Sequence, residues 1–191
     1  IAFRSFAQKS GAILLESAQQ LPDFGRYSFI MADPWQILTS HQGQTQLDGQ
    51  EHLGCFFEVL EAQLKRYSVP LLDDLPPFQG GVAGYLGYEA GQLLEVFPQA
   101  DQDELGMPEA WLGFYDVVIA FDHDQRRAWI FSTGFPEMEE KAQLQRAQQR
   151  LREMEERLQM RNLSSFQKTW SAIEVTSDVT EAEDCTAVQQ V

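Results

Sequence analysis

The sequence predicts an α+β fold, with a largely antiparallel sheet or sheets and flanking helices. Three observations predict it: short apolar runs closed by turn residues, two hairpin patterns, and two stretches of helical periodicity. The chain has 191 residues, of which 43% are apolar. This is enough for one domain with a hydrophobic core, with or without a tail.

The first part of the chain carries strand patterns. Residues 12–15 and 27–32 are short apolar runs, and Asp33-Pro34 ends the second because proline cannot donate to a strand ladder. Residues 36–40 and 44–47 flank a His-Gln-Gly turn. The sequence therefore predicts two strands followed by a hairpin.

Helical spacing then replaces the strand pattern. Apolar residues three and four apart predict an amphipathic helix over roughly residues 51–66. Pro76-Pro77 breaks the chain, and residues 80–88 form an apolar segment with four glycines. We interpret these glycines as structural, because glycine permits close backbone packing or a bulge in a strand.

The second half predicts another hairpin. Residues 89–97 have a helical pattern, and residues 99–108 form an acidic loop that ends at a proline. Residues 111–121 are rich in aromatic and β-branched side chains, which predicts one long strand. After a polar turn, residues 128–133 are expected to return as its hairpin partner.

A long charged helix is predicted over residues 137–161, with one narrow apolar stripe. Beyond Asn162 the composition becomes polar and typical of a linker. We therefore expect a domain over residues 1–162, with residues 163–191 as a linker and the start of a further domain.

Charge and composition exclude several classes of function. The formal net charge of −15 opposes binding to nucleic acids and to anionic membranes, since both are polyanions. No apolar run approaches the ~20 residues that span a bilayer. Two isolated cysteines form neither a disulfide scaffold nor a zinc motif. We expect a cytoplasmic protein.

Familiar catalytic motifs are missing from the sequence. The glycine segment lacks the G-x-G-x-x-G spacing of a dinucleotide site and the lysine of a phosphate loop. No G-x-S-x-G serine motif occurs. His41, His52 and His123 are scattered and have no ligand spacing. We expect no catalytic residue and no metal site in this chain.

Two polar clusters at neighbouring strand ends suggest a small ligand site. Glu16 and Ser17 follow the first strand, and Arg26 to Ser28 begin the second. Glu16 could bind an ammonium group, while Arg26, Ser28 or backbone N–H groups bind a carboxylate. The alternative is a Glu–Arg surface pair of little energetic value.

These segments resemble a known family. The resemblance rests on three segments in this order: Leu14-Leu15-Glu16-Ser17 with Gly25-Arg26-Tyr27-Ser28-Phe29-Ile30 and Ala32-Asp33-Pro34; Pro76-Pro77-Phe78-Gln79-Gly80-Gly81-Val82-Ala83-Gly84-Tyr85-Leu86-Gly87-Tyr88-Glu89; and Pro108-Glu109 with Gly113-Phe114-Tyr115-Asp116. They resemble the N-terminal domain of component I of anthranilate and aminodeoxychorismate synthases.

The resemblance implies a synthase that acts on chorismate, with ammonia from a glutamine amidotransferase subunit and Mg²⁺ in a C-terminal chorismate-binding domain. The catalytic groups would lie in that domain, so this chain alone is expected to be inactive. The N-terminal domain would pack on the catalytic domain and contribute to a pocket for L-tryptophan. The matching positions are Glu16, Ser17, Arg26, Tyr27, Ser28 and Phe29.

Two branches of the family remain open. Phe78-Gln79-Gly80-Gly81 and residues 113–123 resemble the aminodeoxychorismate type, which leads to 4-aminobenzoate and folate. Residues 14–17 resemble a string of the anthranilate type. We favour the aminodeoxychorismate branch. A hypothesis of another class is a scaffold that docks a second protein through the acidic helix over 137–161.

Overall fold

Two antiparallel sheets with helices against them make up the part of the chain described by the computed structural model, residues 2–17, 24–95 and 106–160. These residues belong to the first of two units, Ile1–Arg161. The predicted α+β class is confirmed. The predicted linker over 163–191 lies outside the described residues.

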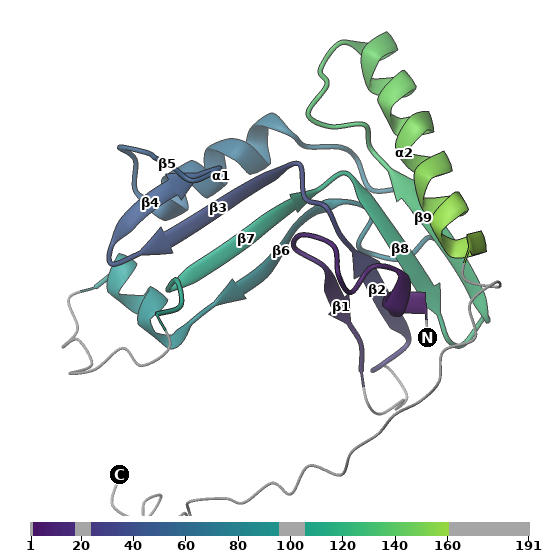
Figure 1. Cartoon of the computed structure of the whole chain (residues 1–191), viewed down its shortest axis with the longest axis horizontal. Coiled ribbons are helices and arrows are strands. Elements are labelled where there is room, and N and C mark those ends of the chain that lie inside the picture. The colour runs from purple at the N-terminus through teal and green to yellow at the C-terminus, as the bar shows by residue number, and fades with distance from the viewer. Residues whose placement is uncertain (1, 18–23, 96–105, 161–191) are drawn as a thin grey trace, which may run out of the picture. The chain divides into compact units, whose positions relative to one another are not determined.

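The first sheet has the strand order β1-β2-β8-β9, with every neighbouring pair antiparallel (Figure 1). Its strands are β1 (Ile13–Leu15), β2 (Tyr27–Met31), β8 (Val117–Asp122) and β9 (Arg127–Ser132). Helix α2 (Glu140–Met160) and the 3-10 helix η1 (Ala2–Ser5) lie against one face. Met154 of α2 is buried there with Ile30 and Ile119, so this face forms one hydrophobic core.

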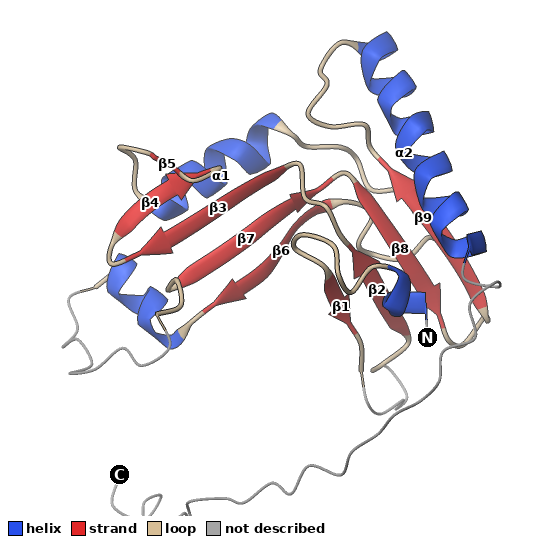
Figure 2. Cartoon of the chain, in the orientation of Figure 1, coloured by secondary structure: helices blue, strands red, loops and turns tan. Residues whose placement is uncertain are grey.

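The second sheet has the order β5-β4-β3-β7-β6 (Figure 2). Its strands are β3 (Gln36–His41), β4 (Gln44–Leu47), β5 (Gln50–Glu51), β6 (Gly81–Leu86) and β7 (Ala110–Tyr115). Helix α1 (Phe56–Arg66) covers one face, where Phe56 and Val59 pack on Leu38 and Leu112. The predicted hairpin is confirmed as β3–β4.

The long strand predicted over residues 111–121 is wrong as a single strand. Its first part is β7 in the second sheet, and its second part is β8 in the first sheet. Asp116 separates them, with a carboxylate that is 1% exposed and bound by two arginines of α2. The chain therefore changes sheets at a buried charge, which the aromatic and β-branched pattern does not reveal.

Two helix boundaries also differ from the prediction. Helix α1 begins five residues later than residue 51, because Gln50–Glu51 pair with β4 as β5. Helix α2 begins at Glu140, where the Glu139 carboxylate accepts hydrogen bonds from the backbone N–H groups of Lys141 and Ala142. The cap, rather than the apolar period, sets this start.

The glycine segment forms β6. The helical pattern predicted over residues 89–97 corresponds to the 3-10 helix η2 (Tyr88–Leu93). Residues 96–105 lie outside the described residues. A Cβ at Gly84 would collide with the backbone carbonyl of Trp111 on the neighbouring strand. The interpretation of this glycine as a point of close backbone approach is confirmed.

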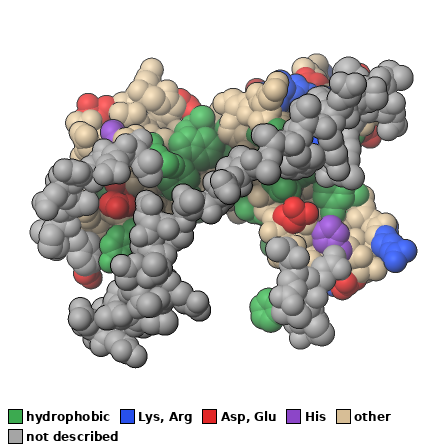
Figure 3. All heavy atoms as spheres, turned by 60° about the horizontal axis from the view of Figure 1, so that its bottom comes forward, with side chains coloured by type: hydrophobic (Ala, Val, Ile, Leu, Met, Phe, Trp, Pro, Cys, Tyr) green, Lys and Arg blue, Asp and Glu red, His purple; other side chains and the backbone are tan. Residues whose placement is uncertain are grey.

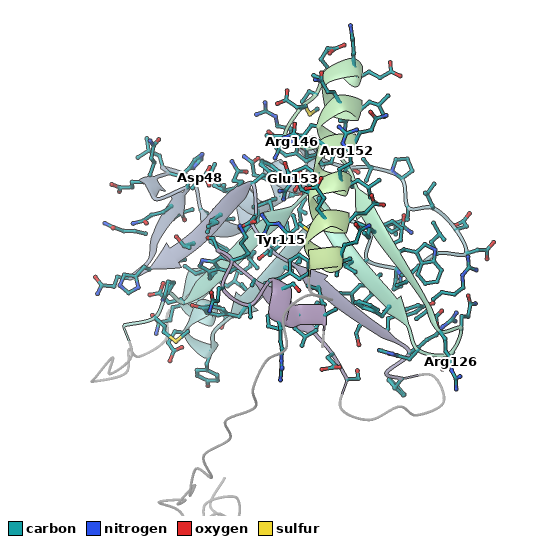
Figure 4. All side chains as sticks on the ribbon, turned by 45° about the vertical axis from the view of Figure 1, so that its right-hand side comes forward. Asp48, Tyr115, Arg126, Arg146, Arg152 and Glu153 are labelled. Carbon is teal, nitrogen blue, oxygen red and sulfur yellow. The ribbon has the colours of Figure 1, made fainter. Side chains whose placement is uncertain are left out.

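Arg150 of α2 joins both places where the chain passes between the sheets. Its Nε lies 3.2 Å from an Asp116 oxygen at the β7–β8 passage, and its side chain is 13% exposed. Its guanidinium also donates to the carbonyl of Asp33, between β2 and β3, at 3.5 Å. Arg146 adds a second contact to Asp116 at 3.4 Å. Figure 4 labels Arg146 and Glu153 on α2 and Tyr115, the residue before Asp116, at the end of β7.

Replacement of Arg150 by Met is expected to lower the free energy of unfolding by about 3 kcal/mol, because it leaves the Asp116 carboxylate buried with a weaker partner. Urea unfolding measures this change. Arg152→Met is the matched control, since Arg152 is exposed on the same helix, and its effect should stay within about 0.5 kcal/mol. Equal losses for the two variants would contradict the prediction.

Candidate functional site

The two predicted polar clusters lie at one edge of the first sheet. Leu15, the last residue of β1, pairs with Phe29, and Tyr27, the first residue of β2, pairs with Asp122. Because the strands are antiparallel, the end of β1, the start of β2 and the end of β8 meet at the same edge (Figure 1). Glu16 and Ser17 therefore follow the strand that neighbours Arg26 to Phe29.

Arg26 is bound to Asp122, which lies 96 residues away in sequence. Its Nε and Nη2 donate to one Asp122 oxygen at 3.0 and 2.6 Å. The other oxygen accepts the backbone N–H groups of Asp124 and Gln125 at 3.0 and 2.9 Å. The hydrogen bond from Arg26 lowers the pKa of the Asp122 carboxyl, and the same bond raises the pKa of Arg26.

Ser28 is bound to His123, which follows Asp122 and begins the turn after β8. Its Oγ lies 2.6 Å from His123 Nε2, and the residue is 4% exposed. The backbone N–H of His123 also donates to the carbonyl of Arg26 at 2.9 Å. The turn after β8 thus holds the first residues of β2 through side-chain and backbone bonds.

Tyr27 and Phe29 lie on the other face of β2, because side chains alternate along a strand. Their ring centroids are 6.1 Å apart, and the Arg26 guanidinium lies 4.8 Å from the Tyr27 ring centroid. Phe29 also contacts the edge of Phe78 at 5.8 Å. The six predicted positions are therefore close together but divided between two faces of the sheet.

Glu16 and Ser17 are both exposed. Among the described residues neither side chain makes a hydrogen bond or ion pair, and the predicted alternative of a Glu16–Arg26 surface pair does not form, since Arg26 binds Asp122. Glu16 is therefore an exposed carboxylate at this edge without a partner among the described residues. Arg26 and Ser28 already have partners.

The face of the first sheet opposite α2 is apolar and only partly covered. Leu15, Phe29, Ala120 and Trp129 form one row across the four strands. Leu15 is 44% exposed, and Phe29 and Trp129 are half-buried. Hydrophobic side chains are visible on the surface that Figure 3 turns forward. This row borders the polar edge just described and supplies apolar contact area.

Asp122 and His123 were not among the predicted site residues. The sequence shows them only as part of a polar turn, and their role depends on the pairing of β2 with β8, about 90 positions apart in the sequence. Tertiary pairing of this kind leaves no local pattern. The available signal in the sequence was the polar turn predicted before residues 128–133, which contains both residues.

The described residues contain no group of three or more His, Cys, Asp and Glu side chains that could hold a metal ion. No helix in the described part of the chain is long and apolar enough to cross a membrane. The groups present at the edge are the Glu16 carboxylate, the Ser17 hydroxyl and the rings of Tyr27 and Phe29.

Comparison with known proteins matches residues 11–191 to the family described as chorismate binding enzyme. The chain is 32% identical over 167 residues to anthranilate synthase component 1 of Pseudomonas aeruginosa, covering 82% of this chain and 33% of that protein. It is 29% identical over 132 residues to aminodeoxychorismate synthase component 1 of Salmonella typhimurium, covering 63% and 28%. The chain spans about a third of the length of these relatives.

The fold matches a solved structure as well. The crystal structure of anthranilate synthase component I from Streptococcus pneumoniae aligns with a TM-score of 0.55 at 21% sequence identity. The alignment covers 74% of this chain and 33% of that one. At this identity the match supports the fold of the two sheets.

The Arg26–Asp122 pair predicts a pH dependence of stability. The pKa of Asp122 is lowered from its ordinary value of 3.8 by folding, so the pair stabilises the fold fully above pH 3.8 and loses this contribution as the pH falls through the lower folded-state pKa. Asp122→Asn should therefore unfold at lower denaturant concentration at pH 6 and lose less stability than the wild type between pH 5 and pH 2.

Urea midpoints at several pH values measure this difference. Asp73→Asn is the control, because Asp73 is an exposed aspartate in the loop after α1. Parallel pH profiles for Asp122→Asn and the wild type would show that the pair has no net effect on stability.

Proposed function

The chain belongs to the family of chorismate binding enzymes, and we propose that it is the non-catalytic N-terminal domain of component I of an aminodeoxychorismate synthase. The edge at which residues 14–17 and 26–29 lie side by side supports an N-terminal domain of component I. The resemblance of residues 78–81 and 113–123 favours the aminodeoxychorismate branch. The chain spans about a third of the length of its relatives, which include both aminodeoxychorismate and anthranilate synthases.

In the proposed function, the complete enzyme aminates chorismate at its 4-position and yields 4-amino-4-deoxychorismate. Ammonia would come from a glutamine amidotransferase subunit, and Mg²⁺ would be held by the chorismate-binding domain. This chain would supply no catalytic group. Its part is to pack on the catalytic domain and to provide one wall of a pocket for L-tryptophan.

The chemistry of the edge supports such a pocket. The free Glu16 carboxylate suits an ammonium group, and the exposed Ser17 hydroxyl can donate or accept a hydrogen bond. Tyr27 and Phe29 present aromatic rings for contact with an indole. Together they would form one side of a site for an aromatic amino acid.

The partly covered face of the first sheet supports packing on a catalytic domain. The row of Leu15, Phe29 and Trp129 leaves apolar area in solvent, whereas α2 covers the opposite face. The chain spans about a third of the length of its relatives. We therefore assign the exposed part of this face to the chorismate-binding domain.

The scaffold hypothesis has less support. The apolar stripe of α2 is largely used within the domain, where Met154 is buried and Leu158 packs on the same core. Leu144 remains exposed near the start of the helix. Little apolar surface on α2 is left for a second protein.

The product distinguishes the proposed branch from its alternative. The full-length protein that carries this chain, given chorismate, Mg²⁺ and ammonium, should form 4-amino-4-deoxychorismate, identified by mass spectrometry. A lyase that releases 4-aminobenzoate serves as a second readout. Anthranilate as the product would move the protein to the other branch, and the 191-residue chain alone should form neither product.

Tryptophan should raise the melting temperature of the full-length protein, because a ligand that binds the native state stabilises it. Glu16→Gln removes the charge that would bind the ammonium group and should abolish most of this shift. Glu51→Gln, at an exposed glutamate of the second sheet, should leave it unchanged. A shift that persists in Glu16→Gln would remove Glu16 from the site.

A further inference from the structure

We infer that Asp122 and His123 are the positioning residues of the proposed ligand site, and that Arg26 and Ser28 belong to this support and do not touch the ligand. The inference rests on the proposed function for the identity of the ligand. Its structural basis is the set of bonds between the turn after β8 and the start of β2.

Arg26 has the wrong surroundings for binding a carboxylate ligand. Two of its nitrogens are used by Asp122, whose side chain is 2% exposed, and Asp124 adds a second carboxylate 3.9 Å from Nε. A ligand carboxylate would meet two protein carboxylates at this guanidinium. The arginine is instead held over the Tyr27 ring, where it fixes the position of that ring.

Ser28 also points away from the aromatic face. It shares its face of β2 with Ile30, which packs in the core beneath α2. Its hydroxyl is buried and bound to His123 Nε2. A ligand that contacts Tyr27 and Phe29 on the opposite face would not reach this hydroxyl.

The bonds from the turn nevertheless determine where the ligand-facing groups lie. Tyr27 lies between Arg26 and Ser28, and both neighbours are tied to the turn by side-chain bonds. A backbone bond from His123 to Arg26 extends the pairing by one residue beyond Tyr27. Loss of the turn bonds would therefore move the Tyr27 and Phe29 rings without removing any ligand contact.

Ligand analogues separate a positioning role from direct contact. L-Tryptophan and tryptamine, which lacks the carboxylate, are titrated into the full-length protein by calorimetry. Arg26→Met should weaken both ligands by a similar factor, about tenfold, because it removes the hydrogen bonds from Arg26 to Asp122. If Arg26 bound the carboxylate, the variant would weaken tryptophan and spare tryptamine, which would overturn the inference.

His123 is tested through Ser28. His123→Ala should weaken tryptophan about tenfold, and His123→Gln, which can restore a bond to the Ser28 hydroxyl, should recover most of the affinity. The double variant Ser28→Ala/His123→Ala should be no weaker than the worse single variant, since the two residues act through one bond. Wild-type affinity in both Asp122→Asn and His123→Ala would overturn the inference.

Hydrogen exchange separates failure of this inference from failure of the proposed function. Amides of residues 26–31 should exchange faster in Asp122→Asn and His123→Ala than in the wild type and in Asp73→Asn, with or without tryptophan. If the wild type binds neither ligand but these amides exchange faster in the two variants, the proposed ligand is wrong. The role of Asp122 and His123 in holding the start of β2 is then still supported. Unchanged exchange in both variants overturns the inference.

Discussion

The buried Asp116 carboxylate is the constraint on which the arrangement of both sheets depends. A charge with so little exposure is stable only with partners, and Arg150 and Arg146 of α2 provide them. Arg150 also binds the carbonyl of Asp33, so one side chain contacts both passages between the sheets. The phenol of Tyr115 adds a bond to the carbonyl of Gly11 at 2.6 Å, which ties the N-terminal segment to the same region.

The candidate site inherits its geometry from that charge. Strand β8 begins directly after Asp116, and six residues later it ends at Asp122. Side chains alternate along a strand, so a slip of one residue at Asp116 would place Asp122 on the opposite face and would break the pairing that holds Arg26. The bonds between the end of β8 and the start of β2 therefore depend on a strand register that begins at the Asp116 ion pair.

Local patterns in the sequence predicted most of the strands and both helices, because period and turn residues are local properties. The β3–β4 and β8–β9 hairpins are confirmed since each joins neighbouring segments. The division of residues 111–121 at Asp116 escaped prediction, because it depends on arginines of α2 more than 25 positions away. For the same reason the sequence indicated Arg26 and Ser28 as polar groups near a strand end but not their partners Asp122 and His123.

The two faces of the first sheet explain why a folded N-terminal domain would contribute to a site without forming all of it. The face beneath α2 is complete, with Ile30, Ile119 and Met154 buried together. The opposite face leaves Leu15 and Phe29 partly in solvent, next to a Glu16 carboxylate with no partner among the described residues. Burial of the Glu16 carboxylate without a partner would cost free energy, whereas burial of the neighbouring apolar side chains is favourable. A single covering domain, as proposed, would bury the aromatic row and close the charged edge around a ligand at the same time.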